Sequence, residues 1–270
     1  EVRQFGQLFD QFGESRDIEV DGRTVFMASG ISGLQIFDVS DPANPELSGS
    51  YENNPDFTSG VSVRNPFVFI ADRRGGLRII NYSDRENLVE VGFLDTPGDA
   101  LGVDVLNDLV VIADGREGGV RIIDVSDPEN PREIANIDTP GDACAAMIFR
   151  NLVYIADGRS GLLVYEIDPP GEPRLAISFD TPGYLYDVVA QGRWIYLADG
   201  TGGVIIVDIS NGRAEVRSSF DTDNCAKKID VWFDSVYVAD DEGGLLILDF
   251  TDMDRPILRG SLELPGRSMG

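Results

Sequence analysis

The sequence predicts an all-β protein, a six-bladed β-propeller with four antiparallel strands in each blade. Three observations predict it: a six-fold internal repeat, apolar residues that alternate with a period of two, and turn residues that separate the short apolar runs. The repeat is anchored on the last residue of the motif IAD and its variants, which recurs every 41 to 43 residues. The anchor residues are Ser29, Asp72, Asp114, Asp157, Asp199 and Asp240. Such a period with four strands is typical of propeller blades, whereas the units of a strand-rich solenoid, the alternative, are usually shorter.

The third repeat shows the four expected strands in order. Residues 102–108 (GVDVLND) alternate and then turn, and residues 109–114 (LVVIAD) form a short apolar run. Residues 120–126 (VRIIDVS) follow a glycine-rich turn, and residues 131–138 (PREIANID) complete the unit. The second and third runs are apolar on both faces, as expected for sheets packed between neighbouring blades. No stretch shows a convincing helical period.

The repeats leave room for one domain only, and the two chain ends are expected to close it. The six blades are predicted at about residues 15–54, 58–97, 98–140, 141–182, 183–224 and 225–265, with a closing strand at 1–10. Residues 5–9 and residues 257–264 both resemble outer strands of the sixth blade, so we expect them to lie side by side. Alternatively, one outer edge stays open and accepts a strand from a partner, which would join the protein to a larger assembly.

The composition excludes several classes of partner. With 47 acidic and 22 basic residues the net charge is −25, which should repel nucleic acid and anionic membranes. No window approaches the roughly 18 apolar residues of a membrane span, so direct membrane insertion is not expected. The chain begins at Glu1, which fits a removed signal peptide or a trimmed chain, and we expect an extracellular or cell-surface protein. The acidic surface fits either a secreted protein kept soluble by charge or a high-salt habitat.

The repeat resembles a known family. The segment G(L/V)xIIDVSDPxxP after (V/I)YIAD is similar to the LVIVD repeat of bacterial and archaeal proteins, and the resemblance covers residues 16–265. It is sharpest in the first and third repeats (DVSDPANP, DVSDPENP), whereas the second, fourth and fifth repeats depart from it (NYSDREN, EIDPPGEP, DISNGRA). The resemblance implies a propeller that is often extracellular, and it implies little about chemistry because such folds host many functions.

Most of the recurring carboxylates have a structural interpretation. The aspartate of IAD is expected to accept N–H groups of the glycine-rich hairpin that follows it, and the Asp and Ser of DVSDP are expected to cap a tight turn. A calcium ion is the alternative for the IAD turns, since calcium takes six to eight oxygen ligands. No cofactor is required by the sequence. Asp99 and Asp142, in the segments that lead into the third and fourth blades, are the candidate calcium ligands.

Residues that differ from blade to blade at the start of the first strand are the candidate ligand-binding set. Since the blade architecture does not fix them, they are free to line the mouth of the predicted central channel. The set is Arg16, Asp17, Tyr184, Tyr186, Asp187, Lys227 and Lys228. Cations beside aromatic rings suit an anionic or sugar-like ligand. In the alternative interpretation these side chains only fill the channel and pair with one another.

The sequence contains no recognisable catalytic set. Histidine is absent, and Cys144 and Cys225 are expected to be free thiols without an activating base. We therefore predict a non-enzymatic scaffold that binds a protein or a surface polysaccharide through one face. The alternative is a small-molecule site, binding or hydrolytic, at the channel mouth.

Overall fold

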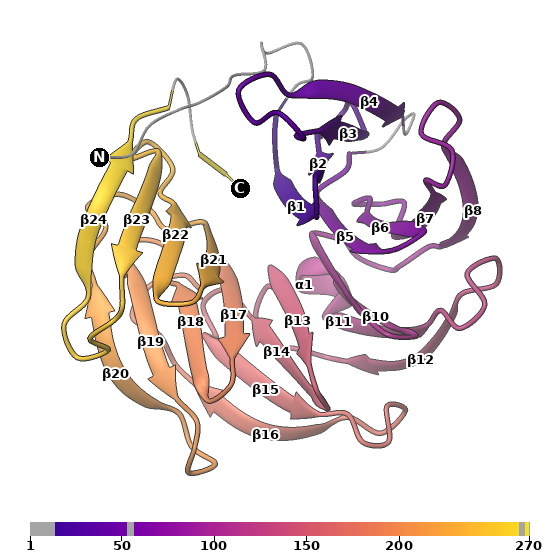
Figure 1. The fold of residues 1–270 in the computed structure, drawn as a ribbon. Coiled ribbons are helices and arrows are strands. Elements are labelled where there is room, and N and C mark those ends of the chain that lie inside the picture. Colours follow the sequence, from indigo (N-terminus) through magenta and orange to yellow (C-terminus); the bar gives the residue numbers. More distant parts are fainter. Residues whose placement is uncertain (1–13, 53–56, 265–267, 270) are drawn as a thin grey trace. The chain divides into compact units, whose positions relative to one another are not determined.

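The computed structural model describes residues 14–52, 57–264 and 268–269 (Figure 1). These residues form six separate four-stranded antiparallel sheets, and in every sheet the strands pair in chain order. This arrangement confirms the predicted all-β fold of six four-stranded blades.

By its internal contacts the chain divides into two compact units of three blades each, and the single domain that the sequence predicts stays a prediction. The N-terminal unit comprises Gln4–Asp138. Its blades contain β1 (Asp17–Asp21), β2 (Thr24–Ala28), β3 (Leu34–Asp38) and β4 (Glu46–Tyr51); β5 (Gly60–Arg64), β6 (Phe67–Ala71), β7 (Leu77–Asn81) and β8 (Val89–Leu94); and β9 (Gly102–Leu106), β10 (Leu109–Ala113), β11 (Val120–Asp124) and β12 (Arg132–Ile137).

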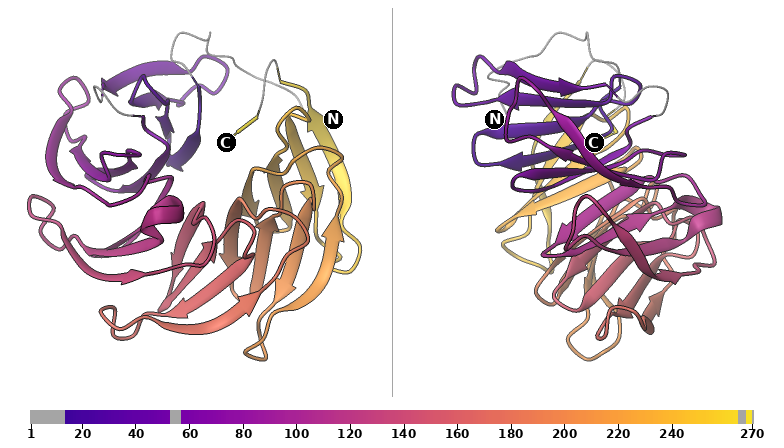
Figure 2. Two further views of the ribbon diagram at one scale, coloured as in Figure 1. Left: turned by 180° about the vertical axis from the view of Figure 1, so that it is seen from behind. Right: turned by 90° about the vertical axis from the view of Figure 1, so that its right-hand side faces the viewer.

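The C-terminal unit includes Thr139–Gly270 and repeats the same plan. Its blades contain β13 (Ala145–Phe149), β14 (Leu152–Ala156), β15 (Leu162–Glu166) and β16 (Arg174–Phe179); β17 (Asp187–Gln191), β18 (Trp194–Ala198), β19 (Val204–Asp208) and β20 (Glu215–Phe220); and β21 (Lys228–Trp232), β22 (Ser235–Ala239), β23 (Leu245–Asp249) and β24 (Ile257–Leu262). Within each unit the sheets lie face to face, and their first strands are neighbours (Figure 2).

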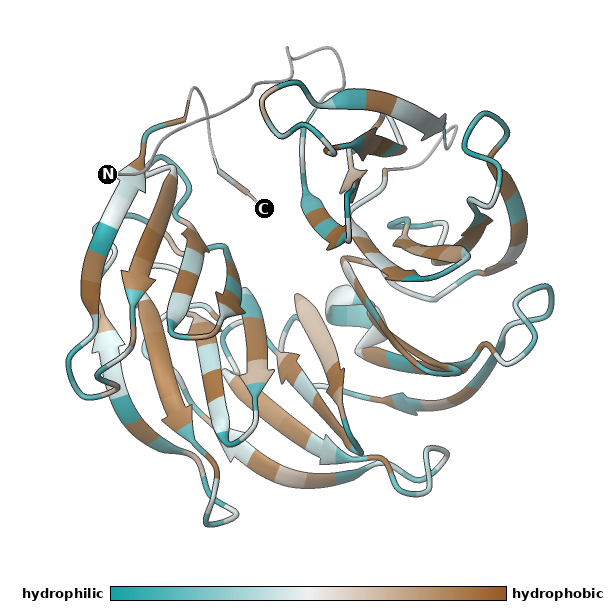
Figure 3. Ribbon diagram, viewed as in Figure 1, coloured by the Kyte–Doolittle hydropathy of each residue, from teal (hydrophilic) through white to brown (hydrophobic). Residues whose placement is uncertain are grey.

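The core of each unit lies between adjacent sheets. Strands such as β6, β10, β14 and β18 are buried on both faces because their side chains alternate between two neighbouring sheets. Phe69 and Ile79 pack against Val110 and Ile112 of the next blade, for example. Figure 3 shows the result, with apolar colour along the middle strands and polar colour at the turns.

Every blade carries the same irregularity between its third and fourth strands. The fourth strand has six residues against five in the third, and a β-bulge at the same register position takes up the extra residue. The bulge follows from strand length, which the repeat fixes.

One short helix departs from the all-strand prediction. Helix α1 (Gly115–Gly118) replaces the tight turn between β10 and β11. The turn is one residue longer here (DGREGGV) than in the fourth blade (DGRSGL), and the extra residue closes an i→i+4 bond from the Gly119 amide to the Gly115 carbonyl. The predicted closing strand at residues 1–10 lies outside the described residues, whereas residues 257–262 form the fourth strand of the sixth blade, as expected.

Candidate functional site

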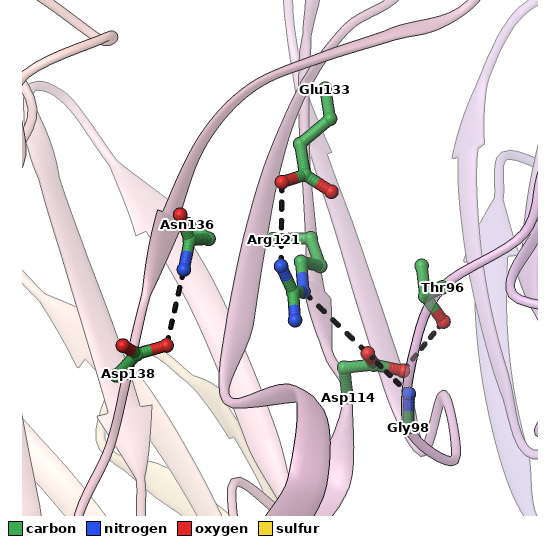
Figure 4. Close-up of polar contacts among 7 residues, drawn as sticks. All are labelled: Thr96, Gly98, Asp114, Arg121, Glu133, Asn136 and Asp138. Atoms are coloured by element: carbon green, nitrogen blue, oxygen red, sulfur yellow. Dashed lines mark hydrogen bonds and ion pairs between the residues drawn. The ribbon is translucent and has the colours of Figure 1, made fainter.

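The repeated aspartate of the IAD motif lies buried where the second strand ends. Its five copies are Asp72, Asp114, Asp157, Asp199 and Asp240. The Asp114 carboxylate accepts hydrogen bonds from the Thr96 hydroxyl at 2.6 Å and from the Gly98 amide at 2.9 Å (Figure 4). Both donors belong to the connector between β8 and β9, so the carboxylate fixes the chain where it passes between two blades.

The same contacts recur in the fifth blade, and they correct the expected partner. Asp199 accepts the Thr181 hydroxyl at 2.6 Å and the Gly183 amide at 2.7 Å, again from the preceding connector. The sequence pointed to N–H groups of the following hairpin instead. The glycine-rich hairpin has another role, since a β-carbon at Gly202 would overlap the Asp199 carboxylate.

Burial raises the pKa of four of these carboxylates, because removal from water disfavours the charged form; they are Asp114, Asp157, Asp199 and Asp240. In the third blade an arginine opposes that effect. Arg121 Nε lies 3.6 Å from Asp114 Oδ2, and Arg121 Nη1 lies 3.3 Å from Glu133 (Figure 4). These groups join strands and connectors, so they belong to the architecture of the blade.

The DVSDP turns are capped as the sequence predicts. Asp38 accepts the Ser40 amide at 2.7 Å, and Asp41 accepts the Ala43 amide at 3.1 Å and the Asn44 side-chain amide at 2.8 Å. The bonds to Ser40 lower the pKa of Asp38. These carboxylates are therefore turn formers.

Two members of the predicted ligand-binding set bond to the neighbouring blade. Asp17 accepts the Val61 amide at 3.0 Å, and Asp187 accepts the Ile229 amide at 3.1 Å. Each carboxylate lies at the first position of a first strand and reaches an N–H on the outer edge of the next blade's first strand, where no further strand of that sheet pairs with it. Such edges carry unpaired backbone groups, so these two side chains satisfy them within the fold. Lys228 Nζ lies 4.0 Å from Asp187 Oδ2.

Three other predicted residues come together in the C-terminal unit. The rings of Tyr184 and Tyr186 lie 4.7 Å apart at 43°. The Lys227 ammonium lies 3.5 Å from the centre of the Tyr186 ring, a cation–π contact. The Tyr184 hydroxyl donates to Asp142 Oδ2 at 2.9 Å, and Cys144 Sγ lies 3.6 Å from the same hydroxyl.

We call Tyr184, Tyr186 and Lys227 the Tyr–Lys cluster. The protonation states of its side chains and of the adjoining Cys144 follow from their burial and contacts. Burial raises the pKa of Cys144 to about 11, so its thiol is protonated at neutral pH. Burial and the contacts with Cys144 and Asp142 also raise the pKa of Tyr184. For Lys227 burial alone would lower the pKa, but the contacts with Tyr186 and Cys225 together outweigh it and the net shift is upward. The cluster thus presents a fixed cation, two aromatic faces and no thiolate at Cys144.

Arg16, another member of the predicted set, belongs to the N-terminal unit. Its guanidinium lies 4.9 Å from the centre of the Phe57 ring and forms an ion pair with Glu14. Arg73 lies 4.5 Å from the same ring centre. The sequence reasoning missed Phe57 and Arg73. The signal was Arg73 itself, which stands where four other blades have glycine after IAD or its variant.

Calcium binding at Asp99 and Asp142 stays a prediction. Asp142 accepts the hydroxyl of Tyr184, and the Gly115 turn approaches the backbone of Asp99. Across residues 14–52, 57–264 and 268–269, no three acidic or cysteine side chains gather as a metal-ion site. Both cysteines, Cys144 and Cys225, are free thiols.

An exposed aromatic pair, which the sequence reasoning also missed, lies at the turn between β21 and β22. Trp232 is 68% exposed and Phe233 is 72% exposed, and their rings meet edge to face at 5.3 Å. Phe233 has a left-handed backbone with φ of 53°. The equivalent left-handed positions of other blades include Gly22, Asn107 and Gly192, so an aromatic residue there was the signal.

The blades and their connectors define the protein as a β-propeller, and comparison with known proteins identifies its family. A family model described as the LVIVD repeat matches residues 12–53, 57–96, 97–139, 140–181, 182–213 and 225–263. The chain therefore belongs to the LVIVD-repeat family, as the sequence resemblance indicated.

Solved structures share the fold at low sequence identity. A protein from Lactobacillus plantarum is 11% identical, with a TM-score of 0.78 over 94% of this chain and 86% of that one. The WD40 β-propeller domain of Doa1 is 10% identical, with a TM-score of 0.74 over 94% and 83%. These likenesses confirm the propeller fold. No curated protein matches the chain. Within the described residues, no helix has the length and apolar character needed to cross a membrane.

Proposed function

We propose that this protein is a non-enzymatic binding module, outside the cell or at its surface, that holds a macromolecular partner through the aromatic pair Trp232–Phe233. The partner is a protein or a neutral surface polysaccharide, because a net charge of −25 disfavours anionic partners. Exposed tryptophan is typical of binding hot spots, where a large ring offers contact area at a small entropy cost.

The observation that carries the proposal is the backbone of Phe233. A bulky residue at φ of 53° is strained by about 1–3 kcal/mol, whereas Gly22 and Gly192 adopt the same conformation freely. Phe233 is exposed, so its ring gives the core nothing in return. A strained, exposed aromatic side chain beside an exposed tryptophan is explained by contact with a partner.

The remaining surface supports a binding role without catalysis. The recurring carboxylates at the turns and connectors bond to the backbone of the blades, as Asp41 and Asp199 do. The thiol of Cys144 is held protonated by burial. These groups are therefore occupied in holding the blades rather than poised for acid–base or nucleophilic chemistry.

The test compares two glycine variants that relieve the same kind of strain. Phe233→Gly removes half of the aromatic pair, and Arg150→Gly is the matched control because Arg150 has φ of 61° at the corresponding turn of the fourth blade. Immobilised full-length protein is exposed to shed surface material from its source cells, with and without protease treatment. We expect the wild type and Arg150→Gly to retain the same component and Phe233→Gly to lose it. Equal capture by Phe233→Gly overturns the role of the pair, and a protein that captures nothing yet hydrolyses an ester or lactone overturns the binding function.

A second candidate function, a small-molecule site, is favoured by the Tyr–Lys cluster. Two adjoining aromatic rings beside a charged lysine suit a sugar ring that carries an acidic group. Titration with glucuronate and with glucose, followed by tyrosine ring resonances, tests it. Shifts that vanish in Lys227→Gln support this candidate, and unchanged resonances with both sugars end it.

A further inference from the structure

We infer that the N-terminal unit holds a second, independent site, which binds the carboxylate or phosphate group of a small molecule between Arg16 and Arg73. Both guanidinium groups contact the ring of Phe57, at 4.9 Å and 4.5 Å from its centre. They therefore lie within the span of one small ligand. The residues that define this site all belong to the N-terminal unit.

Two like charges beside one ring are unexpected in so acidic a chain. Buried arginines elsewhere in the unit face carboxylates: Arg78 lies 3.6 Å from Asp72, and Arg121 lies 3.6 Å from Asp114. Arg73 instead donates its Nε to the Ser59 hydroxyl at 3.3 Å, and among the described residues its terminal nitrogens meet no carboxylate. Within the part of the chain that the structure describes, its two terminal nitrogens remain available as a fork of donors, the geometry that matches an oxyanion.

Arg16 is held in a similar state. Its side chain is 23% exposed, and its Nε is buried without a hydrogen-bond partner in the described part of the chain. A buried donor without a partner is costly, so it marks a place where an acceptor belongs. The only carboxylate paired with Arg16 in the described residues is that of Glu14, whose side chain is 68% exposed. Glu14 thus shows that Arg16 donates to a carboxylate, and its carboxylate would compete with an external one.

The backbone conformation of Arg73 also supports a binding role for its guanidinium. Arg73 has φ of 30°, while the corresponding turn residues Gly30, Gly158 and Gly200 have φ of 54°, 56° and 57°. A side chain at such φ values is strained. Four blades place glycine at this position, Gly115 included, and the sixth places Asp241 there with φ of 49°. The second blade keeps an arginine instead, at the position that brings a guanidinium to Phe57. Its retention against the local backbone preference indicates a task for the guanidinium.

The variant Arg73→Gly gives a direct test because it introduces the residue that four other blades have at this position. It should fold at least as well as the wild type, which thermal unfolding checks. The control is Arg159→Gln, which removes one positive charge from the exposed hairpin of the fourth blade. The probes are inorganic phosphate and succinate, each titrated into the full-length protein in dilute buffer, with binding read from calorimetry and from the arginine Nε–H resonances.

We expect phosphate, succinate or both to bind and to shift the Nε–H resonances of Arg16 and Arg73; the better probe identifies the oxyanion. Arg73→Gly should weaken that binding about tenfold or more, since it removes a charge-assisted pair of bonds. Glu14→Gln should strengthen it several-fold by removing the competing carboxylate, and Arg159→Gln should leave it within about twofold. Absence of binding by both probes at millimolar concentration, or equal affinity in wild type and Arg73→Gly, overturns the inference. Neither result bears on the partner bound through Trp232.

Discussion

The buried aspartate of the third blade allows a quantitative test of what holds adjacent blades together. In Asp114→Ala the Thr96 hydroxyl and the Gly98 amide both lose their acceptor. Hydrogen bonds to a charged group contribute about 1.5–3 kcal/mol each, so the free energy of unfolding should fall by about 3–6 kcal/mol. At roughly 2–4 °C per kcal/mol for a chain of this size, the melting temperature should drop by at least about 6 °C.

Replacing Asp114 by asparagine removes its negative charge but keeps its capacity for hydrogen bonds. In Asp114→Asn the amide oxygen can accept the Gly98 N–H, and the Thr96 hydroxyl can turn to accept from the amide nitrogen, so both bonds persist (Figure 4). What is lost is the negative charge 3.6 Å from Arg121, which then retains Glu133 alone. Because breaking a fully buried pair costs about 3–5 kcal/mol and Glu133 still compensates, we expect a loss of about 1–3 kcal/mol.

Asp199→Asn is the matched control, because the fifth blade has Ile205 where the third has Arg121. The same two bonds can persist there, and burial raises the pKa of Asp199, so a neutral side chain relieves that penalty. We expect a change below about 1 kcal/mol. Denaturant unfolding of the three variants measures these values. Equal losses in Asp114→Asn and Asp199→Asn would show that Arg121 is irrelevant, and a silent Asp114→Ala would refute the connector role itself.

Three further results are expected. Burial raises the pKa of Glu19 to about 7, with Asp104 adding to the effect, so the folded state binds the proton of Glu19 more tightly than the unfolded chain does. Its contribution to the free energy of unfolding is therefore greatest below about pH 4.5 and is lost as the pH rises to about 7. Denaturant unfolding across that range should show a smaller decline in the free energy of unfolding for Glu19→Gln than for the wild type. At pH 8, Cys144 should react with a disulfide reagent about 100-fold more slowly than an ordinary thiol, measured in a Cys225→Ser background, because its pKa of about 11 leaves little thiolate; reaction at the ordinary rate contradicts the burial argument. If the outer strands recruit no second chain, light scattering after size exclusion should give the monomer mass of 29.4 kDa, and a concentration-dependent larger mass would favour assembly by strand addition.

The candidate site was only partly readable from the sequence. Tyr184, Tyr186 and Lys227 were selected because they break the repeat, and they do lie in contact. Asp17 and Asp187 were selected by the same rule, yet they bond to backbone N–H groups of the next blade. A residue that differs from the repeat is not fixed by the structure of its own blade. The sequence does not show whether the residue is instead required by the strand edge of the next blade.

The most informative residues were those whose backbone conformation contradicts their identity. Arg73 and Phe233 occupy left-handed positions that glycine or asparagine fills in most other blades, the exceptions being Asp241 in the sixth blade and Arg150 in the fourth. The aligned repeats already contained that contrast. Its meaning depended on φ, because a substitution in a turn is unremarkable until the left-handed conformation is seen to persist with a large side chain.

The sequence by itself determined the number of blades, the four strands in each and the identity of the turn formers. Strand periodicity, turn chemistry and the 41- to 43-residue repeat are local properties, and every blade restates them. Only the tertiary structure decided which partner each polar side chain takes. Asp114 bonds to a connector that precedes it by 16 to 18 residues, and Asp17 bonds to a strand 44 residues away. Such pairings depend on how neighbouring sheets face each other, which no local pattern encodes.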